Sequence, residues 1–331
     1  MNRFKVFLIV LVLISSKGFA CLNWDIKRLK NKVEVYHDHK EYYVPRGHEF
    51  KIKDFPSLIL DLEKGYEKTK DIDYLSDKGY VLIIQGKYEE ALKLYLEIEK
   101  IKPNRYSTAS NLGTTYELMG ENEKAYEWIK KSIEINPKSH EESEWLHLKI
   151  LEAKIKKIQN PTGEFFIGTN FGSEVLPKTK LSDEELTKLQ DALFFQLNER
   201  ISFIKPKDKI ISVLLFELGN ITLLNEAISD EASEIYELSK KYGFQNNLLN
   251  ERLIICYKKM NEFSLRNNEE LNKMASREQN LSDKLIKKAR KNDNHFGKTI
   301  LFSLAINVIL LICSIVFFIK WRKLKKAATA S

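Results

Sequence analysis

Cysteine is scarce in this chain. The 331 residues include three, Cys21, Cys256 and Cys313, and the last lies within a long apolar run. So few thiols exclude a disulfide framework and a metal cluster held by several thiolates. A single Cys21–Cys256 bridge stays open, because it would form only in an oxidising compartment.

Residue patterns of common catalytic sites are also missing. The chain has no phosphate-binding glycine loop, no nucleophile elbow and no paired catalytic carboxylates. Histidine is rare too, with six residues. His37 and His39 flank Asp38 and would share one face of a strand, as metal ligands can. No second ligand cluster accompanies them, so a solvated loop is the favoured interpretation.

The other histidine pair, His140 and His147, lies seven positions apart among residues typical of helix packing. That setting favours a structural role for both. Together these absences predict no catalytic residue, no bound metal and no cofactor. We therefore expect a protein that is not an enzyme.

Net charge is absent from most of the chain. The net charge of +8 comes entirely from residues 1–20 and 299–331, which hold eight basic residues and no acidic one. Residues 21–298 contain 46 basic and 46 acidic residues. A neutral body gains nothing from counterion release on a phosphate backbone, so the composition predicts no nucleic-acid partner.

The N-terminal segment 1–20 predicts a secretory signal. It combines a short basic start, an apolar run from Val6 to Ile14 and small residues before Cys21. Nine apolar residues are too few to cross a bilayer, which needs about 20. Two alternatives stay open: an uncleaved anchor, and a lipid attached to Cys21, although Gly18 stands where lipoproteins usually have leucine.

The C-terminal apolar run predicts a transmembrane helix. Thr299–Ile319 contains no charged residue, and Trp321 follows at its edge. The tail over 320–331 is basic, as cytoplasmic tails usually are. The opposite flank is basic as well, so the predicted signal decides the orientation. We expect a single-pass membrane protein with an exported body, periplasmic or extracellular, and a short cytoplasmic tail.

A repeat with one constant period is the strongest pattern in the body. Its four landmarks, each recurring from i to i+34, pair Gly79 with Gly113, Gly86 with Gly120, Ala91 with Ala125, and Pro103 with Pro137. The first glycine and the alanine fit the crossing of two helices, where small residues allow close approach. The second glycine fits a helix-ending turn, and the proline fits the exit of the second helix.

These residues resemble the tetratricopeptide repeat, with two full units over Ile72–Ser139. The segment NLGTTYELMGENEKAYEWIKKSIEINP, Asn111–Pro137, carries most of the resemblance. Ile98 and Lys78 depart from the family pattern. The segments EWLHLKILEAKI and CLN are similar to an uncharacterised set of exported bacterial proteins of this family. The resemblance implies an all-α solenoid of stacked helical hairpins.

Further segments complete the predicted organisation. Residues 21–71 would form an N-terminal segment, with a short hairpin over Val33–Gly47 and a capping helix over Pro56–Lys68. The array would cover 72–158, ending in a helix over Glu142–Ile158, and a loop would cover 159–181. Residues 182–257 would be helical, with a degenerate repeat over Phe216–Phe244. A capping box of Ser182 and Glu185 would start this part.

A stalk helix is predicted over 258–298, between the body and the span at 299–319. Apolar residues recur there at spacings near three and four, which suits a dimerising coiled coil. Asn267 and Glu278 interrupt that seam. A homodimer through the stalk, a single solvated helix and a helix folded back on the repeats therefore all stay open.

By resemblance, a ligand groove would lie along the first helices of the repeats. It would include Tyr80, Ile83, Ile84, Ser110, Asn111, Thr114, Glu117, Leu118, Glu144, Leu148 and Leu151. Only Asn111 matches the clamp with which some family members hold a carboxylate, so no such clamp is predicted. An apolar and acidic groove would suit a helical or extended peptide with basic and apolar anchors. The alternative is that later helices fill the groove.

The sequence thus predicts a membrane-anchored scaffold that mediates protein–protein interaction at the cell envelope. Its alternative is a sensory or regulatory ectodomain that passes a binding signal through the transmembrane helix. An enzyme centred on His37 and His39 is a third and less favoured interpretation. The partner and the process are not encoded in any motif.

Overall fold

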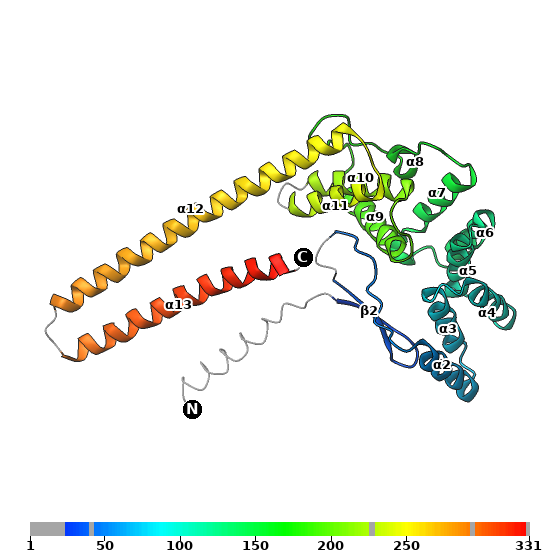
Figure 1. Cartoon of the computed structure of the whole chain (residues 1–331), viewed down its shortest axis with the longest axis horizontal. Helices are drawn as coiled ribbons and strands as arrows, with labels where there is room; N and C mark the ends of the chain where they lie inside the picture. Colours follow the sequence, from blue (N-terminus) through cyan, green and yellow to red (C-terminus); the bar gives the residue numbers. More distant parts are fainter. Residues whose placement is uncertain (1–23, 40–42, 225–228, 292–294, 329–331) are drawn as a thin grey trace, which may run out of the picture. The chain divides into compact units, whose positions relative to one another are not determined.

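The computed structural model describes residues 24–39, 43–224, 229–291 and 295–328. The predicted signal over 1–20 and Cys21 lie outside the described residues. The chain divides into two compact units, Met1–Met260 and Asn261–Ser331. The described part is helical apart from one two-stranded sheet, so the predicted all-α repeat fold is confirmed (Figure 1).

The sheet is an antiparallel hairpin of β1, Trp24–Arg28, and β2, Glu34–His39. Its turn is closed by a bond from the Leu29 amide to the Val33 carbonyl, with Lys32 at a φ of 71°. The prediction of a hairpin within Val33–Gly47 was therefore wrong about the partner strand. Pro45 lacks an amide hydrogen and suits a ladder poorly, and β2 pairs instead with the preceding strand.

The repeat region is a series of helices with matched lengths. After α2, Phe55–Thr69, come α3, Ile72–Ile84, and α4, Tyr88–Ile101, and then α5, Tyr106–Leu118, and α6, Asn122–Ile135. Gly86 and Gly120 occupy the turns within the pairs with φ of 75° and 82°, where a side chain would be strained. Pro103 and Pro137 follow α4 and α6 closely.

Close helix contacts explain the small residues of the repeat. A Cβ at Gly79 would lie 2.5 Å from the ring of Tyr95, and one at Gly113 would lie 2.4 Å from Cδ1 of Ile129. Ala91 is fully buried in the same core. The first helix of each pair thus rests against a large side chain from the second helix.

The helix α7, Glu144–Ile155, ends the repeat region, and the segment after it is not wholly a loop. A short helix, α8, Gly163–Ile167, interrupts the predicted loop over 159–181. Thr162 caps it, because its side chain accepts a hydrogen bond from the Phe165 amide. Its Phe166 is buried in the core, which fixes the helix in place.

Three helices and the start of a fourth, α12, Asn247–Lys291, form the rest of the first unit. The three are α9, Asp183–Phe203, α10, Lys209–Leu224, and α11, Ser229–Tyr242, and the Ser182–Glu185 capping box at α9 is confirmed. A Cβ at Gly219 would lie 2.7 Å from the ring of Tyr236. The pair α10–α11 therefore repeats the Gly79–Tyr95 contact, with the aromatic residue one position further along the chain.

A fully buried arginine ties the loop after α8 to this part of the core. Arg252 donates from Nη1 to Oδ1 of Asn220 at 2.5 Å, and from Nη2 to the carbonyls of Gly172 and Glu174, both at 2.9 Å. The Asn220 oxygen also accepts the Tyr236 hydroxyl. These acceptors satisfy Nη1 and Nη2 of the buried guanidinium, whereas Nε has no hydrogen-bond partner among the described residues.

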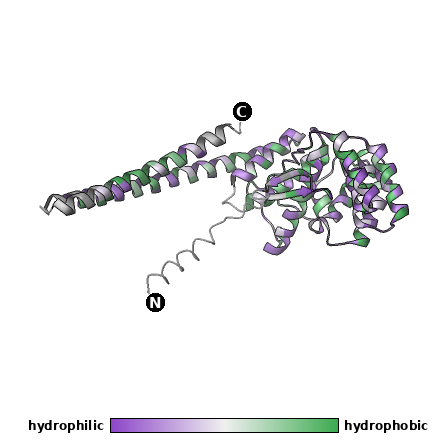
Figure 2. Ribbon diagram, turned by 90° about the horizontal axis from the view of Figure 1, so that it is seen from below, coloured by the Kyte–Doolittle hydropathy of each residue, from purple (hydrophilic) through white to green (hydrophobic). Residues whose placement is uncertain are grey.

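The predicted stalk belongs to a longer helix, α12, Asn247–Lys291. Leu249, Leu253 and Cys256 are buried in the first unit, so the helix begins eleven positions before the predicted stalk. The last helix is α13, His295–Ala328. Among the described residues, Ser303–Arg322 of α13 is long and apolar enough to cross a membrane by length and composition, and Figure 2 shows it as a hydrophobic stretch.

Candidate functional site

The predicted groove is partly occupied by α9. This helix lies against the wall formed by the first helices of the repeats, where Nη1 of Arg200 contacts Oε1 of Glu117 at 2.6 Å. Gln196, one turn earlier, donates to the Ser143 hydroxyl at 3.0 Å. The alternative of a groove filled by a later helix therefore holds for the part around Glu117.

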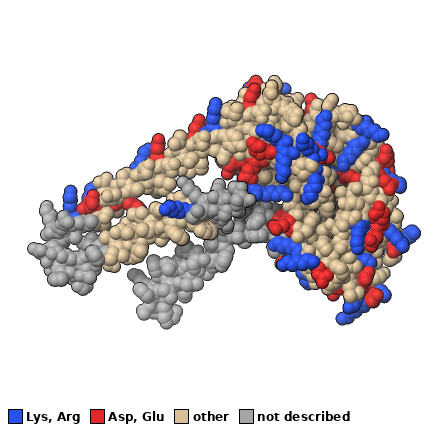
Figure 3. Space-filling view, in the orientation of Figure 1, with Lys and Arg blue, Asp and Glu red and all other residues tan. Residues whose placement is uncertain are grey.

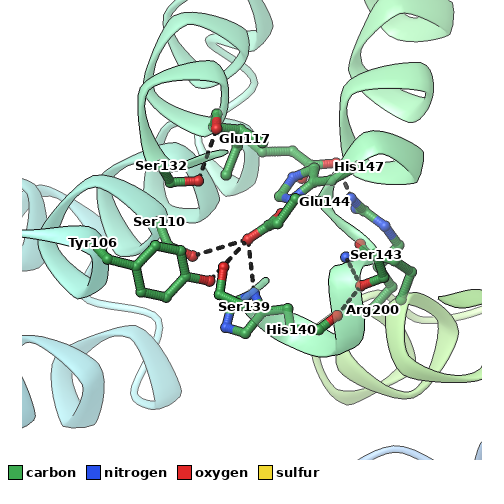
Figure 4. A network of polar contacts seen from close by, with 12 residues as sticks. Tyr106, Ser110, Glu117, Ser132, Ser139, His140, Ser143, Glu144, His147 and Arg200 are labelled. Atoms are coloured by element: carbon green, nitrogen blue, oxygen red, sulfur yellow. Dashed lines mark hydrogen bonds and ion pairs between the residues drawn. The ribbon is translucent and has the colours of Figure 1, made fainter. Parts of the chain in front are cut away.

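A buried polar network fixes this contact (Figure 4). Glu117 accepts bonds from Arg200, from Nζ of Lys154 at 2.7 Å and from the His147 ring at 2.7 Å. The other ring nitrogen of His147 meets Glu144 at 3.1 Å, and His140 meets Glu144 at 2.7 Å. His147 thus lies between two carboxylates on neighbouring helices, α5 and α7.

Electrostatics favours the charged form of Glu117, Glu144 and His147. Burial opposes ionisation of Glu117, but Arg200, Lys154 and His147 outweigh it and hold its pKa well below the usual range. Burial likewise opposes ionisation of Glu144, yet its histidine neighbours lower its pKa. Burial and Arg200 disfavour the imidazolium of His147, but the two carboxylates raise its pKa. The two carboxylates therefore favour the imidazolium form of His147, in which both ring nitrogens donate.

A second buried histidine joins the hairpin to α9. The ring of His48 contacts Oδ2 of Asp38, on β2, at 2.7 Å and Oε1 of Glu199, on α9, at 2.9 Å. It stacks on Tyr36 with ring centroids 3.8 Å apart. Burial lowers the pKa of His48, but the two carboxylates outweigh burial and raise it to about 9. The hairpin is thereby held against the helix that fills the groove.

A cavity of about 720 Å³ lies between the His48 contact and the Glu117 network. Residues of the hairpin, of the first helices of the repeats and of α9 line it. Its lining includes Ile26, Lys27, Tyr36, Asp73, Ser76, Asp77, Tyr80, Ile83, Arg105, Ser107, Ser110, Asn111, Thr114, Phe195, Glu199 and Phe203. A second, smaller cavity of about 70 Å³ adjoins Glu117, Leu118 and the ring of His147.

The structure separates the predicted groove residues into groups. Tyr80, Ile83, Ser110, Asn111 and Thr114 line the larger cavity, while Ser110, Thr114, Glu117, Leu118 and Glu144 line the smaller one. The rest lie elsewhere: Ile84 packs with the core beneath the hairpin, and Leu148 and Leu151 pack in the repeat core.

One lining residue of the larger cavity keeps a hydrogen-bond donor without a partner. Nη2 of Arg105 pairs with Asp73, whereas Nη1 is buried, closed off from the cavity and without a partner among the described residues. Asn111, one of the predicted groove residues, donates to the Tyr95 hydroxyl at 2.9 Å. A buried guanidinium nitrogen without a partner is costly.

The acidic character expected of the groove is largely neutralised. Glu117 and Glu144 are satisfied internally, as described, by Arg200, Lys154 and the histidines. Around the larger cavity, five basic side chains stand against three acidic ones: Lys27, Arg28, Lys30, Lys32 and Arg105 against Asp73, Asp77 and Glu199. The cavity therefore suits acceptor groups better than the basic anchors that the sequence suggested.

The histidine-rich segment forms part of β2. The side chains of His37 and His39 are outside the described set, while Asp38 between them contacts His48 and accepts from Asn198 at 3.1 Å. Within the described residues, no group of three or more His, Cys, Asp or Glu could hold a metal ion.

Several site residues could not be found by pattern. Arg200, His48 and Arg105 belong to no repeat landmark, and their partners are distant in the chain. The alternation of polar and apolar residues on α9 signals only that one face is buried. The sequence signal for this contact is an arginine on the buried face of α9, because a buried arginine usually has an acidic partner.

Comparison with known proteins gives a match to one family model and likenesses to solved structures. Residues 83–159 match the family model described as regulator of microtubule dynamics protein 1-3. The chain is also similar to a solved tetratricopeptide repeat protein from Parabacteroides merdae, at 16% identity and a TM-score of 0.28. That match covers 62% of this chain and 93% of the other. None of the curated proteins compared with the chain matches it.

Proposed function

We propose that this protein is a membrane-anchored scaffold whose cavity between the hairpin, the repeat wall and α9 binds a segment of a partner protein. The observation that carries the proposal is the 720 Å³ cavity with the Arg105 guanidinium among its lining residues. Such a volume holds a few residues of an extended chain. Helical-repeat folds commonly serve protein–protein interaction, which supports this class of function.

The chemistry of the lining suggests how the segment is held. Tyr80, Ile83 and Phe203 offer apolar surface to a side chain. The positive charge of the Arg105 guanidinium favours a peptide carbonyl or a carboxylate. Lys27, whose Nζ lies 5.7 Å from the centre of the Tyr80 ring, adds positive charge at the same place.

The anchor is the other part of the proposal. The predicted signal over 1–20 would export the body, and Ser303–Arg322 of α13 would hold it in the membrane with the basic tail inside. The first unit then stands in the periplasm or outside the cell. Its surface mixes both signs of charge, as Figure 3 shows, which suits an aqueous compartment.

Site-specific crosslinking in intact cells tests the cavity. A photoreactive amino acid in place of Tyr80 should yield an adduct with one partner, and Arg105→Gln should reduce that adduct several-fold. The same amino acid in place of Leu60, which is 49% exposed on α2, is the matched control and should not yield the adduct. An adduct of equal yield from both positions would contradict the proposal.

A sensory role is the second candidate, and the continuity of α12 favours it. One helix begins among buried residues of the first unit and continues for 45 residues toward α13. In a sensory protein, a conformational change at the cavity would have to pass along α12 to the transmembrane segment of α13. Deletion of 261–280 should abolish signalling but leave scaffolding largely intact, so the cavity adduct measured beside a downstream response separates the two functions.

A homodimer through α12 remains part of the proposal. Met260, Leu271, Met274, Leu281 and Leu285 recur at heptad-like spacing, and all are solvent-exposed in the single chain. Asn267 and Glu278 interrupt the seam. Disulfide trapping with Met274→Cys should give a covalent dimer, and Arg266→Cys, off the seam, should not.

A further inference from the structure

The C-terminal end of α12 differs in charge from the rest of that helix. Residues 261–280 carry three basic and four acidic side chains, whereas residues 281–291 carry five basic and one acidic. The basic residues are Lys284, Lys287, Lys288, Arg290 and Lys291. Such a change within one helix concentrates a positive potential in its last three turns.

The described side chains in these turns are open to a partner. Lys284 and Lys287 are solvent-exposed, and Leu281 and Leu285 expose 59% and 36% of their surface. Leu281 and Leu285 are four positions apart and so lie on one face of the helix. Apolar side chains beside a basic cluster are typical of helices that bind the interface of a membrane.

The chain itself brings this segment to a bilayer. Lys291 precedes the start of the apolar run at Thr299 by eight positions. Even when fully extended, a stretch of that length reaches at most about 28 Å. The basic turns are therefore confined near the headgroups wherever the first unit lies. This confinement raises their effective concentration at the surface, so binding needs little intrinsic affinity.

We infer that the last three turns of α12 bind anionic phospholipid headgroups of the membrane that α13 crosses. The inference rests on the proposed membrane anchor. Lys284 and Lys287 would contact phosphate groups, and Leu281 and Leu285 would enter the interface between headgroups and acyl chains. When bound in this way, the C-terminal end of α12 lies along the membrane surface. The lipid composition of the membrane then sets how far the first unit extends from that surface.

A test compares the full-length chain in two kinds of vesicle. One is made of phosphatidylcholine, and the other also contains phosphatidylglycerol. Hydrogen–deuterium exchange of amides in 281–291 is measured beside that of 261–273. Exchange in 281–291 should slow at least about fivefold with the anionic lipid and recover in high salt, while 261–273 stays unchanged.

Matched variants assign the effect to the basic turns. Lys284→Gln with Lys287→Gln should abolish the slowing, because each neutralised lysine weakens binding by about fivefold. Arg266→Gln with Lys273→Gln, also exposed on α12, should keep it. Neither pair lies in a core, so helix formation is preserved in both.

Three results would overturn the inference. The first is equal exchange in the two vesicles, and the second is slowing that survives in the 284/287 variant. The third is slowing in phosphatidylcholine that depends on protein density, which would identify a second copy of the chain as the partner. A chain that floats with neither vesicle contradicts the anchor itself, whereas flotation without selective slowing contradicts this inference alone.

Discussion

Glu117 on α5 and Arg200 on α9 form a buried ion pair at 2.6 Å across 83 positions of the chain. Their side chains are 5% and 7% exposed, so neither charge can return to water without opening the structure. The pair brings a helix from outside the repeats into the concave face of the repeats. It thereby determines which part of that face stays available to a ligand.

Removal of the arginine should destabilise the first unit strongly. Arg200→Met leaves Glu117 buried with less positive charge, and loss of one partner of a buried pair costs about 3–5 kcal/mol. Urea unfolding of the detergent-solubilised chain, followed by circular dichroism, measures this. Lys188→Met, which breaks the exposed pair with Glu184, should cost less than about 1 kcal/mol. Equal effects of the two variants would contradict the assigned role.

A methyl group at Gly113 should also be costly. The new Cβ would lie 2.4 Å from Cδ1 of Ile129, so Gly113→Ala should lose about 1–3 kcal/mol, and a bulkier residue should unfold the repeats. Ile129→Val removes the nearest clashing atom, Cδ1, but keeps Cγ1, which would lie 2.6 Å away, so the double variant should recover only part of the loss. Thermal melting of the three variants checks this. Simple additivity would mean that the two residues do not clash.

The His48 contact predicts a loss of stability at alkaline pH. Its pKa rises from about 6.5 in the unfolded chain to about 9 in the folded one. The contribution, up to about 3 kcal/mol, is therefore complete below pH 6.5 and is lost as the pH rises toward 9. The difference in unfolding free energy between the native chain and His48→Gln should shrink over that window. A constant difference would show that the imidazolium is not what stabilises the contact.

The buried carboxyl of Glu217 predicts a second pH dependence of stability, caused by burial and not by charged partners. Burial raises the pKa of this carboxyl to about 7, although Asn220 and Arg252 favour its charge. The folded state therefore binds the proton more tightly, and stability falls as the pH rises from about 4.5 to 7. Glu217→Gln should be neutral near pH 4.5 and more stable than the native chain by up to about 3 kcal/mol above pH 7. Urea unfolding at both pH values measures it.

The repeat region could be predicted from sequence because its signals are local and periodic. Gly79 and Gly113 recur at one spacing, and each meets a side chain 16 positions later. The apolar run of α13 is likewise visible in composition alone. Such features depend on neighbours in the chain, and periodicity carries that information.

The candidate site could not be predicted in the same way. Asp38, His48 and Glu199 meet from three segments, and the pairing of Arg200 with Glu117 depends on how α9 returns to the repeats. The prediction of the hairpin was wrong for a related reason. The alternation of polar and apolar residues in β1 is too weak to mark it as the partner of β2. Long-range pairings of single charges leave no pattern along one sequence.

The guanidinium of Arg252 makes the loop over 171–174 more than a connection. That side chain is wholly buried, and Nη2 takes its acceptors from this loop. A single proteolytic cut in the loop would therefore leave a buried charge without these hydrogen bonds. The damage would spread to Asn220 and to the start of α12, well away from the severed bond. A cut in this loop would therefore weaken the attachment of α12 to the first unit.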